Sequence, residues 1–113
     1  EYYQSVTRMD DGVGRMLKVL DDTKTADNTL VVFLSDNGVP FQGAKTTLYD
    51  SGIHLPLIVK TPGQKANVSD AMASWTDLAP TVLEWCGVKQ PDAMKGRSLL
   101  PILNEKEPKG WDT

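Results

Sequence analysis

The sequence predicts an α/β fold in which helices pack against a short, mostly parallel sheet. Three observations lead to this prediction. Apolar residues recur every three or four positions over 2–20, which is typical of an amphipathic helix. Two short apolar runs without alternation, 30–34 and 55–59, are typical of strands that are covered on both faces. A further apolar segment with helical character follows at 78–86.

The first helix is predicted from one apolar face, opposite a charged one. Steps of three and four residues bring its apolar side chains into one row, formed by Val6, Met9, Val13, Leu17 and Leu20.

The two expected strands each stop at a turn signal. The run 30–34 ends at Ser-Asp-Asn-Gly, and the run 55–59, which Pro56 opens, ends before Thr-Pro-Gly. A short helix is then predicted with Asp77 as its N-cap and Gly87 just beyond its end. Ser98 is expected to cap one further turn.

Composition and charge exclude several classes of protein. The chain has 113 residues with 40% apolar and 24% charged content, which suits one small globular domain. It has no apolar run near the roughly 18 residues of a membrane span, and its net charge of −3 comes without a basic block. We therefore expect neither a membrane nor a nucleic-acid partner. One cysteine and one histidine exclude an internal disulfide and a structural zinc site.

The loop after the first strand carries the residues best suited to chemistry. Ligands of open α/β sheets bind outside the carboxyl ends of the strands, where Asp36 and Asn37 stand. Their carboxylate and amide oxygens suit Ca²⁺ or Mg²⁺. Asp-Asn-Gly is also an ordinary turn sequence, and these three residues alone indicate a turn more strongly than a metal site.

Several motifs follow one another in a family-specific order. Ser-Asp-Asn-Gly is followed by Lys45, then by Tyr-x-x-Gly at 49–52 and a Pro-led strand. Asp-x-x-Val-Gly, Asp-Leu-x-Pro-Thr and Gly-x-Ser-Leu segments stand at 10–14, 77–81 and 96–99. As a set, these motifs resemble the sulfatases of the alkaline-phosphatase superfamily. Val-Pro-Phe after the glycine is most like the heparan N-sulfatase branch.

The resemblance implies a fold, binding partners and a cellular location for the chain. It implies part of an alkaline-phosphatase-like sandwich, with a mostly parallel sheet flanked by helices. We expect 1–103 to be a sulfatase-like α/β fragment and 104–113 to be a tail or linker. The expected partners are a sulfated small molecule or glycan and the rest of the sulfatase chain. By the same resemblance, the location is periplasmic, secreted or lysosomal.

The resemblance also implies roles for single residues. Asp36 and Asn37 match two ligands of the family's calcium ion, and Lys45 matches the cation that binds the sulfate oxygens. A divalent ion and an ammonium group would both stabilise charge as the S–O bond breaks. His54 stands where the family usually has Arg, and we expect it to be partly buried and bonded to the backbone. Asp77 is expected to act only in folding.

The family's nucleophile motif is missing from these residues. Sulfatases convert the first residue of Cys/Ser-x-Pro-x-Arg to formylglycine, whereas Cys86 precedes Gly-Val-Lys-Gln and is expected in the apolar core. We expect a fragment of a calcium-dependent sulfatase that hydrolyses sulfate esters or sulfamates, on sugars. Its formylglycine would lie in an N-terminal part outside the chain, so the chain alone is expected to be inactive.

Two alternatives stay open. The first is another phosphatase or phosphodiesterase of the superfamily. Such enzymes typically carry Asp-His-Gly at this strand end, and their histidine binds zinc. Asn37 stands at the position of that histidine and argues against this alternative, because an amide oxygen is a poor zinc ligand. The second is a non-catalytic remnant that binds anions or carbohydrate. An upstream Cys/Ser-x-Pro-x-Arg motif would support catalysis over the remnant.

Overall fold

The computed structural model describes residues 1–111, and the chain divides into two compact units. One unit comprises Glu1–Thr29 with Thr61–Gly63, and the other comprises Leu30–Lys60 with the chain from Gln64 onward. The candidate site described below lies wholly within the second unit.

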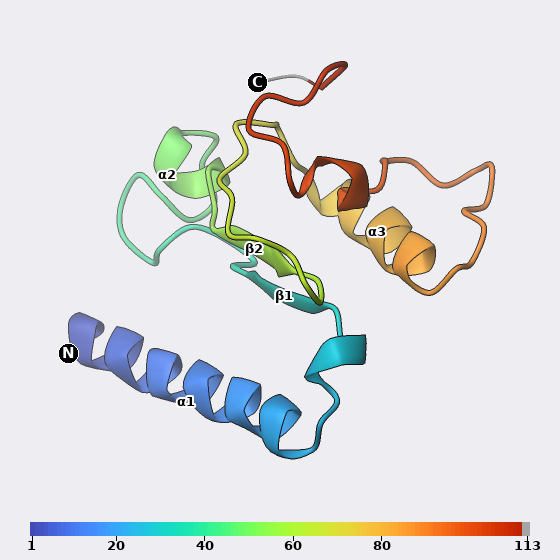
Figure 1. The fold of residues 1–113 in the computed structure, drawn as a ribbon. Helices are drawn as coiled ribbons and strands as arrows, with labels where there is room; N and C mark the ends of the chain where they lie inside the picture. Colours follow the sequence, from blue (N-terminus) through green and yellow to red (C-terminus); the bar gives the residue numbers. More distant parts are fainter. Residues whose placement is uncertain (112–113) are drawn as a thin grey trace. The chain divides into compact units, whose positions relative to one another are not determined.

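The first unit is built on the predicted amphipathic helix, α1 (Tyr2–Asp22) (Figure 1). An exposed ion pair with a Lys18 Nζ to Asp22 Oδ1 distance of 2.7 Å lies in its last turn. Thr23 caps the end of the helix, and its N–H donates to the Val19 carbonyl at 2.9 Å. A 3-10 turn, η1 (Ala26–Asn28), follows. The apolar spacing therefore predicted this helix correctly.

The sheet of the second unit has two strands, β1 (Val31–Leu34) and β2 (Leu57–Lys60) (Figure 1). They pair antiparallel, from Val31 opposite Lys60 to Leu34 opposite Leu57. The prediction of parallel strands is wrong for this pair. The expected cover on both faces is also wrong for β2, whose residues alternate between half-buried and exposed, with Ile58 61% exposed. The connection between the strands holds only a one-turn helix, α2 (Asp50–Ile53), instead of the crossover helix that parallel strands need.

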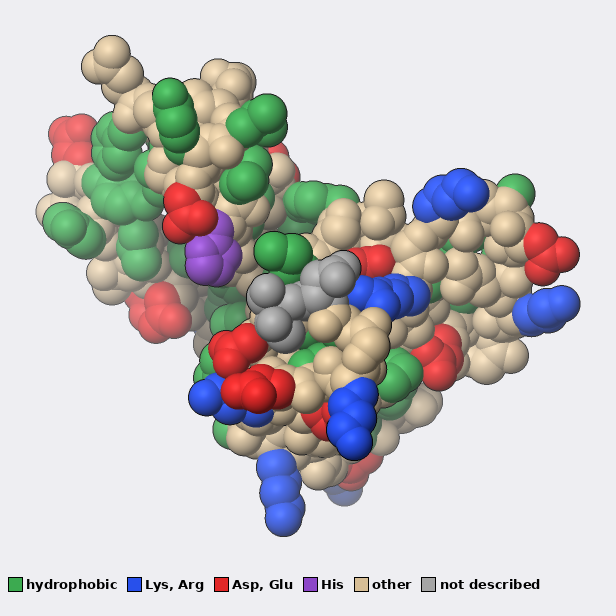
Figure 2. Space-filling model, turned by 90° about the horizontal axis from the view of Figure 1, so that it is seen from above, with side chains coloured by type: hydrophobic (Ala, Val, Ile, Leu, Met, Phe, Trp, Pro, Cys, Tyr) green, Lys and Arg blue, Asp and Glu red, His purple; other side chains and the backbone are tan. Residues whose placement is uncertain are grey.

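The helix α2 leads to His54, which lies at the surface. The His54 side chain is 81% exposed, and its Nδ1 lies 3.4 Å from Asp50 Oδ2. Figure 2 shows the single histidine beside an acidic side chain. The expectation of a partly buried, backbone-bonded histidine is wrong, because the ring lies beside the residue four positions earlier instead of turning inward.

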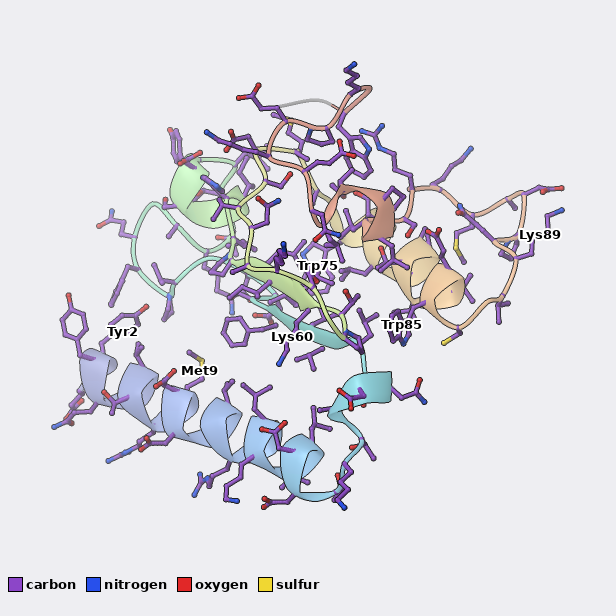
Figure 3. All side chains as sticks on the ribbon, viewed as in Figure 1. Tyr2, Met9, Lys60, Trp75, Trp85 and Lys89 are labelled. Atoms are coloured by element: carbon purple, nitrogen blue, oxygen red, sulfur yellow. The ribbon has the colours of Figure 1, made fainter. Side chains whose placement is uncertain are left out.

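The second helical segment begins one turn earlier than predicted. A 3-10 turn, η2 (Trp75–Asp77), runs directly into α3 (Leu78–Trp85). Trp75 and Trp85 stand at the two ends of this segment (Figure 3). As predicted, Gly87 follows the helix in a left-handed conformation (φ +69°) that glycine adopts without strain. The further turn forms as η3 (Leu100–Ile102), where Ser98 Oγ accepts from the Leu100 N–H at 3.2 Å.

The buried carboxylate of Asp77 joins two distant segments. Its Oδ2 accepts from the Ser74 N–H at 2.8 Å and its Oδ1 from the Arg97 N–H at 2.9 Å. Asp77 is 6% exposed. Its carboxylate does not cap α3 as predicted but closes a capping box that begins at Ser74. The predicted structural role is correct, although the element that the carboxylate caps is different.

Thr81 repeats this connection one turn later. Its buried Oγ1 donates to the Asp77 carbonyl at 2.6 Å and accepts from the Leu99 N–H at 2.9 Å. The backbone of Gly96 packs directly against the Thr76 carbonyl, and a Cβ at this position would collide with it. We call the bonds of Asp77 and Thr81 to residues 97 and 99 the Asp77 clamp.

The described part of the predicted tail, residues 104–111, contacts other segments of the second unit. The Asp70 N–H donates to the Lys106 carbonyl at 2.8 Å, and the Arg97 guanidinium lies 3.6 Å from the centre of the Trp111 ring. Cys86, expected in the core, is exposed where α3 ends. Within residues 1–111, no helix is both long enough and apolar enough to cross a membrane.

Candidate functional site

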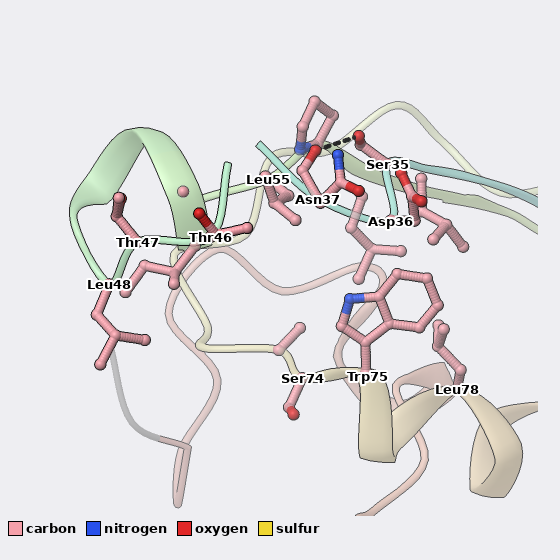
Figure 4. A pocket seen from close by; sticks show the side chains of 16 residues that line it. Ser35, Asp36, Asn37, Thr46, Thr47, Leu48, Leu55, Ser74, Trp75 and Leu78 are labelled. Atoms are coloured by element: carbon pink, nitrogen blue, oxygen red, sulfur yellow. Dashed lines mark hydrogen bonds between the residues drawn. The ribbon is translucent and has the colours of Figure 1, made fainter. Parts of the chain in front are cut away.

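A pocket of about 530 Å³ opens at the carboxyl end of β1. Its walls come from four segments, which lie within 34–37, 46–48, 52–57 and 73–78 (Figure 4). Small-molecule sites typically have volumes of about 300–1,000 Å³ and combine apolar walls with a few polar groups. The pocket has this character, and the predicted metal ligands Asp36 and Asn37 both line it.

Asp36 and Asn37 present oxygen atoms that no other described residue engages. The Ser35 hydroxyl donates to the Asn37 carbonyl at 2.8 Å, which fixes the turn after β1. The Asn37 amide nitrogen donates to the Gly38 carbonyl at 3.0 Å, so the side-chain oxygen remains available. Within residues 1–111 the exposed Asp36 carboxylate has no hydrogen bond or ion pair. The pair therefore offers two hard oxygen donors on successive residues of one pocket wall.

Two glycines of the motifs fold the loop that carries these donors. A Cβ on Gly38 would collide with the Ser51 carbonyl, and a Cβ on Gly52 would collide with the carbonyls of Ala44 and Thr47. The backbone on either side of the loop passes in direct contact at these points. Ser-Asp-Asn-Gly and Tyr-x-x-Gly thus meet in space, which explains why both motifs end in glycine.

Lys45 lies on the same loop but outside the pocket wall. Its side chain is exposed, and its backbone N–H donates to the Val39 carbonyl at 3.2 Å. The next residue, Thr46, has a φ of +70°, which is strained for a β-branched residue. Thr46 and Thr47 line the pocket. The structure therefore brings Asp36 and Asn37 together, and the sulfate-binding role of Lys45 stays a prediction.

Three pocket residues were not identified by the sequence motifs. Thr46 and Ser74 contribute hydroxyl groups to the lining, and Trp75 contributes an indole that is 54% exposed. Its ring is turned toward the segment that carries Asp36 and Asn37 (Figure 4). The Ser-Trp-Thr-Asp sequence at 74–77 is a capping-box signal that could have located this turn.

The donor set fits part of a calcium shell. Ca²⁺ takes six to eight oxygen ligands, and Asp36 and Asn37 supply carboxylate and amide oxygens of the preferred kind. Among residues 1–111, no group of three or more His, Cys, Asp or Glu side chains could hold a metal ion. Asp36 and Asn37 by themselves therefore offer only part of such a shell.

Comparisons with known proteins point to one family. The family model described as Sulfatase matches residues 1–88. The human N-sulphoglucosamine sulphohydrolase is 42% identical over 118 aligned residues, which cover 94% of this chain and 23% of that protein. The chain thus spans about a quarter of the length of this relative.

Solved structures agree with the sequence comparison. A protein solved in complex with its substrate D-glucosamine-2-N,6-O-disulfate superimposes with a TM-score of 0.83 and 34% identity, over 95% of this chain and 23% of that chain. A phosphonate monoester hydrolase from Silicibacter pomeroyi superimposes with a TM-score of 0.80 and 38% identity, over 91% of this chain and 21% of that chain. The backbone of the chain therefore follows part of the fold of two much longer proteins.

Proposed function

The chain belongs to the sulfatase family, and on that premise we propose that it forms part of the metal and sulfate site of a calcium-dependent sulfatase. The proposed substrates are sulfate esters or sulfamates of sugars. The name of the human relative and the ligand of the solved complex both describe sulfated glucosamine, which supports this substrate class. A periplasmic, secreted or lysosomal location and an alkaline-phosphatase-like sandwich complete the proposal.

The observation that carries the proposal is the pair of unengaged oxygens at the carboxyl end of β1. Asp36 and Asn37 line the pocket, and the hydrogen bonds at Ser35 and Gly38 hold their backbone and amide in place. These two residues would hold calcium, whose charge polarises a bound sulfate group. Because no donor within residues 1–111 occupies the exposed Asp36 carboxylate, its oxygens are available to a cation at the pocket.

Lys45 is proposed to bind the sulfate oxygens. Its ammonium group carries no ion pair within residues 1–111, and its flexible stem starts one residue before the pocket wall. A cation beside an anionic ester stabilises the negative charge that builds as the S–O bond breaks. Lys45 therefore would strengthen its contact with the substrate along the reaction.

The nucleophile is proposed to come from outside these residues, as a formylglycine. Cys86 is exposed at the end of α3 and does not line the pocket. We therefore expect the purified 113-residue chain to release no sulfate from a chromogenic aryl sulfate. Turnover that survives in Cys86→Ala would contradict this expectation, because it would require another nucleophile within the chain.

The direct test is metal binding, measured separately from activity. Calorimetric titration of the chain with calcium should show weak binding that Asp36→Ala and Asn37→Ala abolish. Asp92→Ala is the matched control, since Asp92 is an exposed aspartate that does not line the pocket. Equal binding by all variants would remove the proposed calcium site.

A second candidate substrate is a phosphonate or phosphate ester. It is favoured by one observation, the 38% identity to a phosphonate monoester hydrolase. Sulfate and phosphonate esters are both anionic and would use the same cation-binding oxygens. A full-length protein that contains this segment should be assayed on matched aryl sulfates and aryl phosphonates. A higher kcat/KM on the phosphonate would replace the proposed substrate class.

A further inference from the structure

We propose that Trp75 is a stacking platform for the sugar ring of the sulfated substrate. The proposal rests on the proposed function above and extends it to a residue outside the metal and sulfate motifs. Asp36 and Asn37 line one side of the pocket, and Trp75 would form an apolar surface of the same pocket that binds the sugar ring.

Trp75 differs from the other two tryptophans of the chain. One face of Trp111 is covered by the Arg97 guanidinium at 3.6 Å, and Trp85 is half-buried on α3. Trp75 is 54% exposed and lines the pocket. Its indole N–H has no hydrogen-bond partner in the described part of the chain. Leu48 and Ile53 of the same pocket are exposed as well, so Trp75 stands out by its flat aromatic ring, which faces the segment of Asp36 and Asn37 (Figure 4).

The backbone of Trp75 is held rigidly although its ring is exposed. It lies between Ser74 and Asp77, whose capping box is closed by a 2.8 Å bond. The Asp77 clamp anchors the same turn to the Arg97 N–H at 2.9 Å. A platform fixed in this way binds a ligand with little loss of conformational freedom.

The rest of the pocket suits the polar edge of a sugar. A pyranose has an apolar C–H face that packs on an aromatic ring and hydroxyl groups around its rim. Thr46 offers a hydroxyl that has no hydrogen-bond partner within residues 1–111, and it lines the same pocket. Asp36 and Asn37 hold the position proposed for calcium, so a sulfate on the ring would point toward them. Trp75 would thus bind the ring while the metal site binds the charged group.

The test is a titration followed by NMR of the tryptophan indole N–H groups. The isotope-labelled 113-residue chain, in calcium-containing buffer, is titrated with D-glucosamine-2-N,6-O-disulfate, with unsulfated glucosamine and with inorganic sulfate. The indole signals are assigned from Trp75→Phe and Trp85→Phe. We expect the disulfated sugar to shift the Trp75 signal saturably, and to leave the Trp85 signal unchanged.

Variants measure how much the ring contributes. Binding of the disulfated sugar is followed at the backbone amides of Asn37 and Thr46. Trp75→Ala should weaken this binding roughly 3- to 10-fold, which is the scale of one aromatic contact, whereas Trp75→Phe should lose less. Trp85→Phe is the matched control and should bind like the original chain.

Three results would overturn the platform. Inorganic sulfate alone could produce the same Trp75 shift, which would mean that the residue senses only the anion. The sugar could shift the amides of Asn37 and Thr46 without moving the Trp75 signal, which would leave the proposed function intact. The Trp75 signal could stay fixed in every titration while Trp75→Ala only lowers thermal stability, which would make Trp75 a packing residue. The calcium titration of Asp36→Ala decides the proposed function independently of all three.

Discussion

Asp36 and Asp77 carry the same side chain in opposite surroundings. Asp77 is 6% exposed, and its two carboxylate oxygens accept from the backbone N–H groups of Ser74 and Arg97. Asp36 is exposed at the pocket, and no donor within residues 1–111 reaches its carboxylate. Both aspartates lie in motifs of the sulfatase family, so membership of a motif does not separate them.

The difference shows how a structural carboxylate is distinguished from a binding one. A buried carboxylate must find protein donors, because an unsatisfied buried charge is costly. A carboxylate that binds a metal needs at least one oxygen available to the ion, even when a protein donor holds the other. Asp77 therefore fixes the turn from which Trp75 extends, whereas the unoccupied carboxylate of Asp36 at the pocket suits the metal role that we propose for it.

The largest expected effect is the loss of activity when the metal ligands are removed. In a full-length protein that contains this segment, Asp36→Ala and Asn37→Ala should remove calcium and reduce sulfate release to background. Metal analysis and a sulfated-sugar assay measure the two consequences. Full calcium content together with a normal rate in both variants would show that these oxygens are not metal ligands.

A smaller but still large effect is expected for Lys45. Lys45→Ala should lower kcat/KM by roughly 10²–10³, the scale of losing one charge-stabilising donor, in the same full-length protein. Lys45→Arg should retain more activity because a guanidinium also binds sulfate oxygens. Steady-state kinetics on a sulfated sugar measures both. An unchanged kcat/KM in Lys45→Ala would mean that Lys45 is a solvated loop residue.

Local sequence patterns predicted the elements that depend on local interactions. The apolar spacing predicted α1, the first apolar run predicted β1, and Gly87 predicted where α3 ends. The resemblance of the motifs to the sulfatases is confirmed by the family model over residues 1–88. Strand direction was mispredicted, because it depends on the path of the loop between β1 and β2, which no local pattern encodes.

The candidate site was predicted in part for the same physical reason. Asp36 and Asn37 were found because strand ends and oxygen donors are readable from sequence, and the structure places both in one pocket. Trp75 belongs to no motif, and its exposure is a property of the folded turn. The environments of Cys86 and His54 were mispredicted because hydrophobic or family context does not fix the exposure of a single side chain.

The Asp77 clamp should control stability instead of chemistry. Asp77→Ala should lower the free energy of unfolding of the chain by about 1–3 kcal/mol, because two N–H groups lose their acceptor. Asp77→Asn keeps one acceptor oxygen and should lose less. Denaturant unfolding measures both, and Thr81→Val, which removes the acceptor of the Leu99 N–H, provides an independent break in the clamp. Unfolding curves that coincide with that of the original chain would contradict the structural role.

The smallest expected effect is on the stability of the chain without its ligand. Asp36→Ala should change the free energy of unfolding by no more than about 0.5 kcal/mol in calcium-free buffer, because the exposed carboxylate has no hydrogen bond or ion pair within residues 1–111. Calcium should then raise the melting temperature of the original chain, since an ion that binds only the folded state stabilises it, and should leave Asp36→Ala unaffected. A large loss of stability without calcium would show that Asp36 is a structural carboxylate like Asp77. Equal calcium stabilisation of both proteins would place the ion elsewhere.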